Sequence, residues 1–65
     1  MAATPLYLVV ITSTNRKGRT SAVDVDLIMG IRAVRNAVRE AIADGDGAFV
    51  YEFNEDGSVG ALVDV

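Results

Sequence analysis

The side chains of this 65-residue chain with the clearest chemical potential are charged, and the basic ones all precede Glu40. The six basic residues form two groups, which are Arg16, Lys17 and Arg19 within the stretch TSTNRKGRTSA, and Arg32, Arg35 and Arg39 further on. The second group has the spacing i, i+3 and i+7, so a helix would place it on one face. An arginine side chain presents a planar fork of donors that suits phosphate or carboxylate. Both groups are therefore candidate phosphate-binding residues, and the alternative is that the first group is a solvated hairpin tip and the second a solvated helix face.

Acidic residues dominate the second part of the chain, where no basic residue follows Asp44. The acidic residues from that point are Asp44, Asp46, Glu52, Glu55, Asp56 and Asp64. The net charge is -3 and the isoelectric point is about 4.5. A chain with its charges segregated in this way can pair with a second copy or with a charged partner.

Catalysis lacks its usual side chains in this sequence. The chain has no His and no Cys, which removes nucleophilic triads, thiolate ligands and the commonest base at neutral pH. The stretch DGDG from Asp44 matches only the start of a calcium loop, because Ala48 and Phe49 stand where a further ligand and a Gly are required. We therefore expect no enzymatic activity, no cofactor and no metal site.

Apolar alternation and β-branched residues predict two hairpins separated by one helix. The expected elements are strands at Leu6–Thr14, Arg19–Val25, Ala48–Phe53 and Val59–Val65, and a helix that begins near Leu27 and ends before Gly45. The two Asn-x-x-Gly stretches at 15–18 and 54–57 fit tight turns closed by a left-handed Gly. The prediction is a single α+β domain over residues 1–65 with the order ββαββ, in which one helix crosses one face of a four-stranded antiparallel sheet.

The predicted helix carries an apolar stripe that would pack on the sheet. Its residues recur at spacings of three and four and are Leu27, Ile31, Val34, Val38 and Ile42. Either Asp24 or Asp26 is expected to cap the helix N-terminus. The aromatic residues Phe49, Tyr51 and Phe53 share one face of their strand, and we expect them in the core beneath the helix rather than stacked on bases.

The first strand is apolar on both faces, since Leu6, Leu8 and Val10 alternate with Tyr7, Val9 and Ile11. A single helix covers only one face of a sheet. We therefore expect the second face to pair with another chain, most simply with a second copy in a two-fold dimer. A partner would also supplement the small core of a chain that has no disulfide.

In its small size, acidic charge and compact α/β architecture the chain resembles the anti-CRISPR proteins, small phage-encoded inhibitors of bacterial defence. The resemblance implies a non-catalytic inhibitor that binds a nucleic-acid-handling protein complex in the cytoplasm, which is the host cytoplasm if a phage encodes the chain. The acidic residues Glu52, Glu55, Asp56 and Asp64 would then imitate phosphates against a basic groove of the target. The longest apolar run, Leu6 to Ile11, is too short to cross a membrane.

Two alternative functions fit parts of the sequence. A nucleic-acid-binding homodimer would use the six basic residues, although an acidic isoelectric point is unusual for that class. The ββαββ order is also similar to HicB-type antitoxins, which neutralise a small RNA-cleaving toxin. The Pro- and Gly-containing segment after the second strand of that family has no counterpart here, where Val23-Asp24-Val25-Asp26 leads directly toward the helix.

Overall fold

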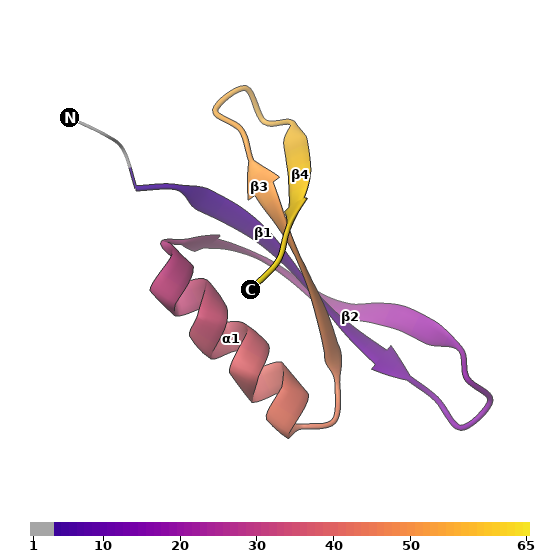
Figure 1. Cartoon of the computed structure of the whole chain (residues 1–65). Helices are drawn as coiled ribbons and strands as arrows, with labels where there is room; N and C mark the ends of the chain where they lie inside the picture. Colours follow the sequence, from indigo (N-terminus) through magenta and orange to yellow (C-terminus); the bar gives the residue numbers. More distant parts are fainter. Residues whose placement is uncertain (1–3) are drawn as a thin grey trace.

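The computed structural model describes residues 4–65 and has the predicted ββαββ order (Figure 1). The elements are β1 (Leu6–Thr14), β2 (Thr20–Met29), α1 (Ile31–Ala43), β3 (Gly47–Phe53) and β4 (Val59–Val63). The four strands form one antiparallel sheet in the order β2-β1-β3-β4, so β2 and β4 are the edge strands. The helix contacts β1, β2 and β3 from one side of the sheet. The predicted α+β fold is confirmed.

Both hairpins close with the turns that the Asn-x-x-Gly spacing predicts. In the first turn Gly18 donates its N–H to the carbonyl of Asn15 at 3.0 Å, and in the second Gly57 donates to the carbonyl of Asn54 at 3.0 Å. Gly18 and Gly57 have φ angles of 78° and 87°, a left-handed conformation that Gly adopts without a Cβ clash. The two turns set the pairing next to them, and a shift of register in each hairpin, between Ile11 and Thr12 of β1 and between Tyr51 and Phe53 of β3, sets the pairing further along the strands.

The helix begins at Ile31, later than the sequence pattern predicts. Leu27, Ile28 and Met29 continue β2 and pair with the first residues of β1. Gly30 ends the strand, with φ at 88°, and it donates its N–H to the carbonyl of Pro5 at 2.9 Å. The predicted caps Asp24 and Asp26 are wrong, because both residues lie within β2 and Gly30 occupies the cap position without a side-chain hydrogen bond.

The core lies between the helix and the inner sheet face. Val9 of β1, Val34 of α1 and Val50 of β3 are fully buried at its centre. Partly buried residues surround them, and these are Tyr7, Ile11, Ile28, Ile31, Val38 and Val63. The predicted apolar stripe is therefore right in its middle and wrong at its ends: Leu27 belongs to β2, and Ile42 is 63 % exposed.

The three aromatic residues of β3 do not lie under the helix, so this prediction is wrong. Val50 pairs with Val9, and this pair faces the helix. Because successive side chains of a strand point to opposite faces, Phe49, Tyr51 and Phe53 point to the face that the helix leaves uncovered. Apart from Glu52, the residues on both faces of β3 are apolar or Gly, so the sequence of this strand alone does not decide which face packs on the helix. The smaller valine packs beneath the helix.

Candidate functional site: the open face of the sheet

The sheet face away from the helix is apolar across all four strands. Its central strand β1 contributes Leu6, Leu8 and Val10, and residues paired with them in register share this face. The residues of this surface, called the open face from here on, are Leu6, Leu8, Val10, Val25, Leu27, Met29, Phe49, Tyr51, Phe53, Val59 and Leu62. They form one continuous patch from edge strand to edge strand.

Large side chains of the open face stand in solvent. On β2, Leu27 is 51 % exposed and Met29 is 65 % exposed, and on β4 Leu62 is 62 % exposed. None of the open-face positions defined by the described strand pairings carries a charged residue. Exposed apolar patches of this breadth mark interaction surfaces, because leaving them in water costs free energy that a partner would recover.

The opposite side of the molecule holds a groove between β2 and the helix. Asp24 and Asp26 pair with Ile11 and Val9, so their side chains point toward the helix side of the sheet. This groove has a volume of about 360 Å³, and its acidic lining residues are Asp24, Asp26, Glu40, Asp44 and Asp46. Sequence reasoning missed this acidic groove because it placed both aspartates at a helix cap. Extending the strand alternation to Met29 would have revealed it.

The four predicted partner-binding acids do not form one cluster. Glu55 and Asp56 lie in the turn between β3 and β4, and Glu52 is exposed on β3. Asp64 follows the other end of β4 and lines a separate groove near Val38 of the helix. The structure therefore places a pair of acids at a hairpin tip and leaves Asp64 apart from it.

Asp56 is held within its turn by Ser58. Its carboxylate accepts one hydrogen bond from the Ser58 hydroxyl at 2.6 Å and another from the Ser58 N–H at 2.9 Å. These bonds stabilise the ionised form and lower the pKa of Asp56 below its ordinary value of 3.8. Asp56 therefore stays ionised at lower pH than an aspartate without these hydrogen bonds.

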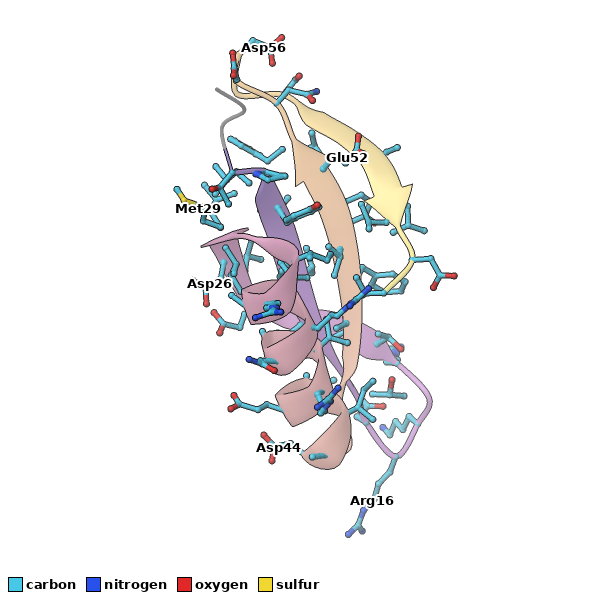
Figure 2. All side chains as sticks on the ribbon, turned by 60° about the vertical axis from the view of Figure 1, so that its left-hand side comes forward. Arg16, Asp26, Met29, Asp44, Glu52 and Asp56 are labelled. Atoms are coloured by element: carbon cyan, nitrogen blue, oxygen red, sulfur yellow. The ribbon has the colours of Figure 1, made fainter. Side chains whose placement is uncertain are left out.

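The predicted basic residues lie on two different elements. Arg16, Lys17 and Arg19 occupy the tip of the β1–β2 hairpin, where Arg16 points away from the rest of the molecule (Figure 2). The amide N–H groups of Lys17 and Arg19 donate to the side-chain oxygen of Asn15 at 2.9 and 3.0 Å, so they are occupied within the turn.

The second basic group lies along the helix, where Arg32, Arg35 and Arg39 are all exposed. Arg35 and Arg39 border a groove that also contacts Val65 at the end of the chain. The three arginines therefore lie on one helix, as their sequence spacing predicts.

The two hairpin tips lie at opposite ends of an elongated molecule. Figure 2 shows Arg16 at one end and Asp56 at the other, along a longest dimension of 47 Å. The hairpin tips therefore form a basic end and an acidic end, while Asp44, at the end of the helix, lies toward the basic end (Figure 2).

Other site types find little support in the part of the chain that the structure describes. Within residues 4–65, acidic side chains do not converge in a group suited to hold a metal ion. No helix of the same residues has the length and apolarity needed to cross a membrane. Comparisons of the chain with protein-family models, curated proteins and solved structures find no match.

Proposed function

We propose that this chain is a non-catalytic protein-binding module of the inhibitor or adaptor class, and that the open face is its principal contact surface. The supporting observation is the uncharged apolar surface that spans all four strands, with Leu27, Met29 and Leu62 each at least half exposed. Protein interfaces have an apolar centre with a polar rim. Nucleic-acid interfaces are instead polar and positively charged.

The finer proposal is that the module blocks a nucleic-acid-handling complex in the manner of the anti-CRISPR proteins. Glu52 is exposed on β3, and Glu55 and Asp56 lie together in the turn that follows, where hydrogen bonds from Ser58 favour the ionised form of Asp56. A basic groove of a target would meet this hairpin as it meets phosphates, through charge complementarity. Asp64 lies apart and contributes to such a contact only if the target also reaches the far end of β4.

An affinity capture from host lysate, with and without nuclease treatment, tests this function. We expect a stoichiometric protein partner that survives nuclease. The double substitution of Glu52→Lys and Glu55→Lys should abolish its capture, whereas Asp44→Lys with Asp46→Lys, an equal charge change at the other side of the molecule, should retain it. Asp56 is left intact because its carboxylate supports the turn. Retention by the first double variant would remove the charge-based inhibitor proposal.

The second candidate function is nucleic-acid binding through the helix. It is favoured by the common exposure of Arg32, Arg35 and Arg39 on α1. Under this alternative, capture disappears with nuclease, and changing the three arginines to Glu abolishes binding while the Glu52 and Glu55 substitutions do not. Recovery of a small RNA-cleaving protein would instead support a HicB-type antitoxin.

A further inference from the structure

We propose that the occupant of the open face is a second copy of this chain, bound face to face about a two-fold axis that sets the basic end of each copy beside the acidic end of the other. This inference rests on the proposed function, since it names the partner of the same surface. Glu52, which lies on the helix side of the sheet, then remains outside the dimer contact, where a further target can reach it.

The single chain exposes more surface than a compact chain of its length would. The accessible surface of the chain is 4982 Å², whereas a compact monomer of this length is expected to expose roughly 4000 Å². The chain therefore exposes more surface than a compact monomer does, and a standard protein interface covers roughly 800 Å² of each partner. The projecting hairpins supply polar surface to this excess, and the open face supplies its apolar part.

The core of a single chain is correspondingly small. Only three side chains, Val9, Val34 and Val50, reach full burial in the described residues. Small domains without disulfides commonly obtain their missing apolar burial by association. Face-to-face packing of two sheets creates a second apolar layer, in which side chains of both sheets interdigitate about 10 Å apart.

The distribution of charge favours a second copy over a foreign protein. A two-fold contact places the same patch on both sides, so any charge within it would meet its like. The open face avoids this conflict because its register positions carry no charge. The hairpin tips then complement each other, because Arg16 lies at one end of the long axis and Asp56 at the other (Figure 2). Lys17 and Glu55 are their neighbours in the same turns. Antiparallel alignment of two copies brings these opposite charges together at both ends.

Association through the sheet edge is the competing arrangement, and the sequence of β2 opposes it. Asp24 and Asp26 lie in the middle of this edge strand. Antiparallel pairing of β2 with its copy would place these carboxylates against their equivalents, and like charges across strands are destabilising. Charged residues on edge strands commonly prevent such pairing.

The molar mass of the full chain in solution tests the proposal, measured by light scattering and sedimentation across roughly 2–200 µM. We expect a dimer. Leu27→Lys and Leu62→Lys should each raise the dimer dissociation constant at least about tenfold, because both side chains stand on the open face. Ile42→Lys is the matched control, since Ile42 is equally exposed but lies on the helix. Circular dichroism of each variant confirms that it remains folded.

A charge swap at the hairpin tips tests the antiparallel alignment without touching the apolar patch. Arg16→Glu with Lys17→Glu should weaken the dimer by roughly two- to fivefold at low salt. Mixing this variant with one carrying Glu55→Lys should restore a heterodimer. A mixture that dimerises as weakly as the Arg16→Glu, Lys17→Glu variant alone would overturn the antiparallel alignment. The dimer itself would be overturned by a wild-type chain that is monomeric at about 200 µM, or by dissociation with Ile42→Lys but not with the open-face variants.

The outcomes separate this inference from the proposed function. If the wild-type chain is monomeric and Leu62→Lys still abolishes capture of a protein partner, the open face binds a foreign protein: the function stands and the second-copy proposal fails. If the chain is monomeric and Leu62→Lys leaves capture unchanged, both proposals fail.

Discussion

Asp56 is an acidic residue of the second hairpin, and its carboxylate stabilises the turn in which it lies. Its two hydrogen bonds from Ser58 make the carboxylate part of the loop rather than a free surface charge. Asn15, at a different position of the first turn, has a similar role, because its side chain accepts the N–H groups of Lys17 and Arg19. The sequence pattern predicted both turns but not these bonds, because it does not specify which neighbouring N–H a side chain will reach.

The lowered pKa of Asp56 predicts a defined pH dependence of stability. The folded state favours the ionised carboxylate, so in acid the unfolded state binds more protons and stability falls with pH. The contribution of Asp56 should be complete above its unfolded pKa, near 3.8, and should be lost as the pH falls through the lower folded value. Urea unfolding from about pH 6 to pH 2 should therefore show a difference between wild type and Asp56→Asn that shrinks in strong acid.

The neighbouring substitution Glu55→Gln is the control for this pH series. It removes one charge from the same tip and leaves both bonds to Ser58 in place. A pH-independent difference between wild type and Asp56→Asn would mean that the carboxylate's ionisation does not support the turn.

At the scale of elements, the strands and turns were predictable and the junction between β2 and the helix was not. Leu27, Ile28 and Met29 are apolar residues that satisfy both a strand and a helix pattern. Pairing with the long strand β1 decides between them, because it provides ladder hydrogen bonds and a covered face for Ile28. Local sequence does not contain this long-range information, which is why both the helix start and the aspartate caps were wrong.

Gly30 joins β2 to the helix, and we expect its substitution to lower the stability of the fold. Its φ of 88° and ψ of 140° belong to a region that residues with a Cβ rarely adopt. We expect Gly30→Ala to destabilise the fold by about 1–3 kcal/mol, measured by urea unfolding. The Cγ2 atom of Thr4 lies 3.6 Å from the position of the new Cβ, an ordinary contact. The same loss should therefore appear in a Thr4→Ala background, and a smaller loss there would assign the effect to crowding instead.

Two aliphatic residues of the helix, Val34 and Ile42, should differ in how much their substitution lowers the free energy of unfolding. Val34 is fully buried against the sheet, whereas Ile42 is 63 % exposed. Val34→Ala should lower the free energy of unfolding by about 2 kcal/mol, and Ile42→Ala should change it by less than about 0.5 kcal/mol. Thermal and urea unfolding at one fixed protein concentration measure both. Similar losses for the two variants would place Ile42 in the core, as the sequence stripe implied.

At the scale of the whole molecule, the sequence predicted that a second apolar face exists but not how far it extends. Leu6, Leu8 and Val10 were identifiable from the alternation within one strand. Leu27 and Met29 belong to the open face because β2 extends to Met29. Phe49 belongs to it because the pairing of β3 with β1 turns this side chain away from the helix. The separation of the basic and acidic ends similarly required the antiparallel placement of the two hairpins along the long axis. Both features arise from register, which no single segment determines.

If the second copy supplies the missing apolar layer, folding and association become one equilibrium. Unfolding then converts one dimer into two chains, so mass action makes the melting temperature depend on protein concentration. A tenfold increase in concentration should raise the melting temperature of the wild-type chain by about 5 °C, measured by circular dichroism or calorimetry. Leu27→Lys should melt at a lower temperature that does not change with concentration, and Ile42→Lys should behave as wild type. A melting temperature that is high and independent of concentration in the wild-type chain would show that the core around Val9, Val34 and Val50 suffices alone, leaving the open face to a different partner.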